Sequence, residues 1–119
     1  MCATSVACYA IVPAPARDAA QGFLADVRDA SWQSALQRTS AEYQSAHDAA
    51  RLEAEVQRIP RLAQHTSATF VNATVDGETA VLDGTLSSPD GEVPVGVELR
   101  EIDGYWYVEQ LVVQGVPLE

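Results

Sequence analysis

Lysine is absent from the 119-residue chain, and its seven basic residues, all of them arginine, face 17 aspartate and glutamate residues. The formal net charge is therefore −10 at pH 7. Proteins that bind nucleic acids need clustered positive charge to neutralise phosphates, so this deficit excludes a nucleic-acid partner. It also disfavours direct binding to anionic membranes and other polyanions.

Positive charge is scarcest in the second half of the chain. Up to Thr66, six arginines oppose seven acidic residues, which gives −1. From Ser67 onward Arg100 alone opposes ten acidic residues, which gives −9. An acidic half keeps a protein soluble without implying a function, and it can also form a docking face for a basic partner. Both interpretations stay open at this point.

Cysteine and histidine are rare, with two residues of each. Cys2 and Cys8 lie at the start of the chain, outside any segment expected in a core, which argues against a disulfide framework or a zinc site. His47 and His65 lack the close spacing of paired metal ligands. The sequence also has no glycine-rich phosphate loop, Ser-His-Asp set or redox cysteine pair, so we expect no metal and no cofactor.

No apolar run is long enough to span a bilayer, which takes about 20 residues. Residues 2–12 are apolar apart from Thr4 and Ser5, and no basic segment precedes them, so they do not form a complete signal peptide. We interpret residues 1–14 as the remnant of an upstream anchor or signal, followed by a single domain over residues 15–119. This interpretation places the domain outside the cytoplasm, with a membrane contact only through that anchor.

Helical spacing dominates the first half of the domain. After Pro15, which the first turn of a helix tolerates, apolar residues recur every three or four positions over 16–27 and predict an amphipathic helix. Ser31 can cap a second, short helix and Asp48 a third, which Pro60 should end or kink. The apolar positions of these two helices are Trp32, Leu36 and Tyr43, then Leu52, Val56, Ile59 and Ala63.

From Ser67 the apolar period changes from three or four residues to two, which is typical of strands. We expect four strands, at residues 67–75, 79–87, 92–102 and 105–114. The turn signals between them are Asp76-Gly77, Pro89-Asp90-Gly91 and Asp103-Gly104. Because these connections are too short to hold crossover helices, the strands form an antiparallel meander, and the fold class is α+β.

Alternation along the strands assigns their faces. The residues expected to face the helices are Phe70, Asn72, Leu82, Leu86, Val93, Val95, Val97, Leu99, Trp106 and Val108. Those expected to face water are Asp83, Glu98, Arg100, Tyr107 and Glu109. Strict alternation would expose Leu111 and Val113, so we expect a β-bulge near Glu109 and Gln110 that turns them inward. Gly84 and Gly96, both in mid-strand, would let the sheet bend around a helix.

The chain resembles the nuclear transport factor 2-like superfamily, which has a cystatin-like fold, and within it small domains of unknown function attached to bacterial membrane anchors and lipoproteins. The segments that carry the resemblance are residues 23–24, 29–36, 40–43, 80–86, 93–99, 104–108 and 111–115. The resemblance implies a cone in which N-terminal helices pack on a curved four-stranded antiparallel meander, in a protein of the bacterial cell envelope, periplasmic or membrane-anchored. It also implies a possible homodimer, since relatives pair sheet to sheet.

Enzymes of this superfamily place an acidic residue, a histidine or a tyrosine inside the cone. Here Asn72 is the one polar side chain expected on the inner face of the sheet, so the strands supply no base. From the helices, Tyr43, His47 and Asp29 could reach the cone. Both histidines are more simply explained as solvated side chains, and Trp32 and Trp106 as core residues.

Three functions are compatible with these residues. The first is a non-catalytic extracytoplasmic accessory or binding domain whose cone holds a small apolar ligand or is filled, with candidate pocket-lining residues Trp32, Tyr43, Phe70, Asn72 and Trp106. The second is a small isomerase or dehydratase that uses Tyr43, His47 or Asp29. The third is a protein-interaction module that uses the acidic face of the sheet. We predict the first, with no catalytic residues.

Overall fold

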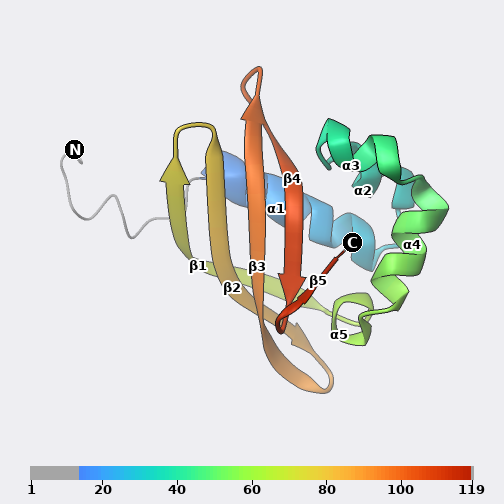
Figure 1. The fold of residues 1–119 in the computed structure, drawn as a ribbon. Coiled ribbons are helices and arrows are strands. Elements are labelled where there is room, and N and C mark those ends of the chain that lie inside the picture. Colours follow the sequence, from blue (N-terminus) through green and yellow to red (C-terminus); the bar gives the residue numbers. More distant parts are fainter. Residues whose placement is uncertain (1–13, 119) are drawn as a thin grey trace.

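The computed structural model describes residues 14–118, in which five helices precede a five-stranded antiparallel sheet with strand order β1-β2-β3-β4-β5 (Figure 1). The helices are α1 Ala14–Arg28, α2 Trp32–Gln37, α3 Ala41–Ala46, α4 Ala49–Gln57 and α5 Pro60–Ala63. The strands are β1 Ser67–Asp76, β2 Thr79–Ser88, β3 Gly91–Ile102, β4 Tyr105–Val113 and β5 Val116–Pro117. The α+β class is thus confirmed. Most of the interpreted tail, residues 1–13, lies outside the described residues.

Helix α1 crosses one face of the sheet and supplies the centre of the core (Figure 1). Its buried residues, spaced three or four apart, are Ala16, Ala20, Phe23, Leu24 and Val27. They pack with Leu82, Leu86, Val97 and Leu99 of β2 and β3. This is the amphipathic helix predicted from the sequence, because burial of one apolar stripe stabilises a helix that is polar elsewhere. No helix within residues 14–118 is long and apolar enough to cross a membrane.

The prediction of three helices is wrong, since the described residues form five. The second predicted helix is interrupted because the backbone at Thr39 pairs with β4. Ser40 N–H donates to the carbonyl of Val108 (2.9 Å), and Val108 N–H donates to the carbonyl of Arg38 (2.8 Å). Ser40 then caps α3 by accepting from Tyr43 N–H. A contact distant in sequence thus breaks a helix that periodicity alone would continue.

The ends of the later helices follow the predicted capping residues. Asp48 accepts a hydrogen bond from the N–H of Arg51 (2.8 Å) and caps α4. Pro60 ends that segment and begins the short helix α5 at its first turn. Ser31 occupies the N-cap position of α2, but its side chain makes no capping hydrogen bond.

The first four strands are consecutive hairpins, as predicted. Asp103 and Gly104 both have positive φ, 55° and 87°, as a type I′ turn requires. The first turn is shifted by one residue from the prediction: Asp76 pairs with Thr79, so that Gly77 and Glu78 form the turn.

The prediction of a four-stranded sheet is wrong, because β5 adds a fifth strand at the edge of β4. Val112 pairs with Pro117, and Val113 pairs with Val116. Gln114 and Gly115 between the two strands have φ of 52° and 81°, the same turn geometry as at Asp103-Gly104. Proline is compatible with this position because an edge strand can leave one N–H side unpaired.

The bulge predicted in β4 is confirmed. Glu98 pairs with Gln110 and Leu99 pairs with Val108, which leaves Glu109 as the extra residue. Beyond it Leu111 and Val113 turn inward, and each is 1% exposed. One added residue shifts the phase of a period-two pattern, so every later side chain changes face.

A second bulge, in β1, moves Asn72 to the face opposite the one predicted. Phe70 pairs with Gly84 and Asn72 pairs with Asp83, so Val71 is the extra residue. Asn72 is exposed beside Asp83, and Ala73 packs against the core instead. The inner face of the sheet therefore lacks the polar side chain that the sequence predicted there.

Gly84 is required where the β1 bulge crosses β2. A Cβ at Gly84 would overlap the carbonyl oxygen of Thr69 and approach Phe70 Cα to 2.8 Å, whereas a Cβ at Gly96 has Asp83 Oδ1 as its nearest neighbour, at 3.5 Å. Gly84→Ala should lower the free energy of unfolding by about 2 kcal/mol or more, because backbone must shift. Gly96→Ala should leave it unchanged or slightly higher. Urea unfolding followed by circular dichroism measures both, and equal effects would contradict the bulge geometry.

Candidate functional site

Aliphatic and aromatic side chains pack the centre of the space between the helices and the sheet. The hollow bounded by Phe23, Thr39, Val108 and Leu111 has a volume of only about 10 Å³, which is at most enough for one water molecule. Phe23, Leu24, Leu52, Leu82 and Leu99 are each at most 1% exposed.

The five residues predicted to line a pocket are distributed between the core and the surface. Phe70 is buried, and Trp32, Tyr43 and Trp106 are partly buried against the core. Asn72 lies on the opposite face of the sheet and is exposed. Among the hollows described here, only Tyr43 of the five contributes to a lining. The structure therefore does not bring the five together.

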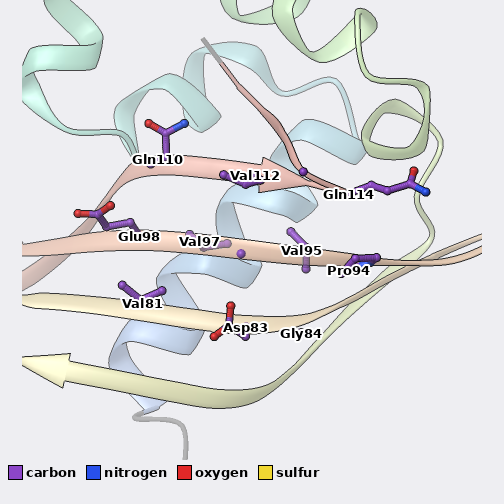
Figure 2. Close-up of a pocket in the computed structure, with 12 residues that line it drawn as sticks. Val81, Asp83, Gly84, Pro94, Val95, Val97, Glu98, Gln110, Val112 and Gln114 are labelled. Atoms are coloured by element: carbon purple, nitrogen blue, oxygen red, sulfur yellow. The ribbon is translucent and has the colours of Figure 1, made fainter.

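The sheet face turned away from α1, here called the outer face, carries an open hollow of about 370 Å³ (Figure 2). Its apolar lining includes Val81 on β2, Gly96 on β3, its cross-strand partner Val112 on β4, and Pro94. Gly96 has no side chain, so it leaves open space between Val81 and Val112. We call this site the outer hollow.

Carboxylates lie on both sides of the apolar surface of the outer hollow. Asp83 is the cross-strand partner of Gly96, and Glu98 is the partner of Val81. Figure 2 shows Glu98 and Gln110 at one end of the hollow, and Pro94 and Gln114 at the other. Neither Asp83 nor Glu98 forms an ion pair within residues 14–118. The hollow thus combines an apolar surface with two carboxylates, one of which, Asp83, lies directly beside Gly96.

A second hollow, of about 390 Å³, lies between α3 and strands β3 and β4, and we call it the α3 groove. Tyr43 and His47 stack along it, with ring centroids 3.8 Å apart and an interplanar angle of 3°. His47 Nδ1 donates to the carbonyl oxygen of Tyr43 (3.0 Å), which holds the stack in place. His47 was expected to be solvated, but it is half-buried.

Carboxylates dominate the α3 groove. Its lining includes Glu42, Glu98 and Glu109. Glu109 is paired with Arg100, whose Nε lies 3.2 Å from Oε2 of Glu109. Glu98 and Gln110 also line the outer hollow, so the two hollows share a boundary.

The third residue considered for catalysis from the sequence, Asp29, does not reach either hollow. It is exposed just after α1 and lies 3.6 Å from Nε of Arg28. Tyr43 and His47 are therefore together, and Asp29 is apart from them. Burial, reinforced by the negative charge of Glu55, raises the pKa of Tyr43 to about 12. Its hydroxyl group stays protonated near neutral pH, where a general base would need a pKa close to 7.

The other histidine, His65, is a core residue and not the solvated side chain expected. It is 2% exposed, and its Nδ1 donates to the carbonyl oxygen of Leu62 (2.7 Å). Burial lowers its pKa below the ordinary value of 6.5, because the charged imidazolium is poorly solvated there. Within residues 14–118, no group of three or more histidine, cysteine, aspartate or glutamate side chains could hold a metal ion.

The outer hollow was missed by sequence reasoning, although a signal for it is present. Alternation assigns Val81 to the water-facing side, the predicted bulge assigns Val112 to the same side, and Gly96 lies next to Val112 on the intervening strand. Apolar residues at outward positions of neighbouring strands, around a glycine, indicate a concave apolar surface.

Comparisons with known proteins show the fold. No family model matches the sequence, and no curated protein matches it. The crystal structure of a DUF4783 family protein from Bacteroides ovatus matches with a TM-score of 0.54 and 14% identity, over 86% of this chain and 93% of that one. The solution structure of a SEC-C motif containing protein from Rhodopseudomonas palustris matches with a TM-score of 0.54 and 12% identity, over 73% of this chain and 69% of that one.

Because these identities are low, the similarity shows the α+β architecture and gives no information about activity. The DUF4783 structure supports the expectation of a small domain of a kind whose function is unknown. The resemblance to the nuclear transport factor 2-like superfamily stays a prediction.

Burial of His65 makes stability depend on pH. Because its pKa is lowered on folding, the unfolded chain binds the proton more tightly, so stability present above pH 6.5 is lost as the pH falls. His65→Asn keeps an N–H donor near the position of Nδ1 but does not titrate. Urea unfolding of both proteins at pH 7.5 and 5.0 should show the wild type losing more stability than the variant. Carboxylates titrate equally in both proteins, so an equal loss would contradict a neutral buried His65.

Proposed function

We propose that this domain is a non-catalytic binding module of the bacterial cell envelope, and that it contacts a protein partner through the outer hollow. One observation carries the proposal: the hollow between Phe23 and Leu111 in the core has a volume of only about 10 Å³, whereas the outer face has an apolar hollow of about 370 Å³. Apolar surface that is open to solvent around a polar rim is typical of interaction sites.

A non-catalytic role is supported by the chemistry of the inner face. Asn72 points outward, and the strands contribute no other polar side chain to the buried cluster. Tyr43 and His47, which an isomerase or dehydratase would have used, lie in an open groove where the pKa of Tyr43 is raised to about 12. An acid-base mechanism needs a group that exchanges protons near neutral pH in a pocket that encloses the substrate.

A protein partner fits the outer hollow better than a small apolar ligand does. Pockets for small molecules bury most of the ligand surface. The outer hollow instead lies along the face of three strands and is open on one side (Figure 2). A single aliphatic or aromatic side chain from a partner would fill the space between Val81 and Val112, while the rest of the partner lies on the sheet.

The cone architecture and the location of the domain also belong to this proposal. Helices on one face of an antiparallel sheet, together with the segments that resemble the nuclear transport factor 2-like superfamily, support membership of that superfamily. The apolar composition of residues 2–12 supports attachment to a membrane by an upstream segment. A homodimer through the outer faces would bring Asp83 and Glu98 of two acidic copies together, so a different partner is favoured.

Titration of the ¹⁵N-labelled domain with N-acetyl-leucine methylamide, followed by NMR, tests the outer hollow. The amide signals of Val81, Gly96 and Val112 should shift together, because the probe displaces water from the apolar surface. Val112→Asp should abolish these shifts, since it places a charge in the hollow. Val75→Asp is the matched control, because Val75 is 49% exposed and lies outside the hollow.

The proposal has two results that contradict it. One is a set of shifts confined to helix or core residues, which would indicate an internal ligand site. The other is a Val112→Asp domain that responds to the probe as the wild type does. Circular dichroism of both variants checks that they keep the fold.

A further inference from the structure

We infer that the α3 groove binds an arginine side chain of the same partner whose apolar side chain fills the outer hollow. The partner segment is therefore both basic and apolar, and it crosses β3 at Glu98. This inference rests on the proposed function and adds the second half of the binding surface to it.

Continuity of the two hollows is the first step. Glu98 and Gln110 are cross-strand partners and line both hollows, so the apolar surface and the α3 groove meet at this pair of side chains. If a bound, extended chain places one side chain against Val112, the side chain two residues further along lies beside Glu98. Side chains two residues apart in an extended segment are about 7 Å apart on one face, which suits two adjoining hollows.

The charge of the groove is the second step. Glu42, Glu98 and Glu109 line it, and Arg100, the only basic residue after Ser67, is used by Glu109. Glu98 is half-buried and has no ion pair within residues 14–118. No arginine of this chain lines the α3 groove within residues 14–118, so the position beside the Glu98 carboxylate is open to a cation of the partner.

The aromatic pair distinguishes arginine from other cations. Tyr43 and His47 are stacked along the groove, and a planar guanidinium group can lie against an aromatic ring while its N–H groups donate to a carboxylate. Glu98 supplies the carboxylate, and the Gln110 amide oxygen supplies a further acceptor. Phosphates and carboxylates as ligands are disfavoured by the same three glutamates.

Two peptides separate this inference from the proposed function. Acetyl-leucyl-threonyl-arginine amide carries both features, and the same peptide with citrulline in place of arginine has nearly the same shape without the charge. NMR titration should give about fivefold tighter binding for the arginine peptide, which is the upper range for a partly exposed charge pair. Both peptides should shift the amides of Gly96 and Val112, whereas the amides of Tyr43 and His47 should shift strongly only with the arginine peptide.

Glu98→Gln is the decisive variant, because it removes one charge and keeps the side-chain size. It should abolish the fivefold preference for arginine, so that the variant binds the two peptides with equal affinity. Glu78→Gln is the matched control: it changes the net charge equally, but Glu78 lies in the β1–β2 turn, exposed and away from both hollows. Thermal unfolding of both variants verifies that the fold is kept.

The possible outcomes are distinct. If both peptides bind equally to the wild type at the outer hollow, the inference about the α3 groove is overturned and the proposed function stands. If Glu78→Gln weakens the arginine peptide as much as Glu98→Gln does, the attraction comes from net charge, and the inference is again overturned. If neither peptide shifts the outer-face amides, both the inference and the proposed function fail.

Discussion

The extra residue in β4, Glu109, determines which side chains of the last long strand enter the core and which line the outer face. Before the bulge, Val108 faces the helices, and after it Leu111 and Val113 do so. Without the bulge these two side chains would face water, at a cost of about 1.5–3 kcal/mol for each. The same change of phase directs Gln110 and Val112 to the outer face. The packing of the core and the shape of both hollows therefore depend on one inserted residue.

Both edge strands of the sheet are partly protected from pairing with other chains. The β4 edge is covered at Val108 by the backbone of residues 38–40, and at Val112 and Val113 by β5. The uncovered part of β4 between these contacts includes the bulge, where regular pairing could not continue in any case. On the opposite edge, β1 carries its own bulge at Val71, over Gly84. Bulges and short covering segments limit the pairing of edge strands with other chains.

Local patterns account for most of the fold that could be predicted from the sequence. Helix α1, the hairpin turns and the β4 bulge follow from apolar spacing and turn chemistry, which act over a few residues. The interruption of the second helix at Thr39 could not be predicted, because its cause is a backbone contact with Val108. The position of Asn72 depends on the β1 bulge, for which the mid-strand Gly84 was the only local sign. Strand β5 was missed although Gln114-Gly115 repeats the turn geometry of Asp103-Gly104.

The candidate site was harder to predict than the fold, because a pocket depends on whether packed layers leave space. The five residues expected to line an interior cavity are the right types for one, yet neighbouring aliphatic side chains fill that space. Because the core is packed, the residues that stabilise the fold differ from those proposed to bind the partner. Substitutions on the outer face, such as those at Val112 or Glu98, leave the buried cluster intact, so the outer face could acquire its apolar and acidic residues without a loss of core packing. Because Arg100 pairs with Glu109, Glu98 has no ion pair within residues 14–118, and the proposed partner would neutralise it at the boundary of the two hollows.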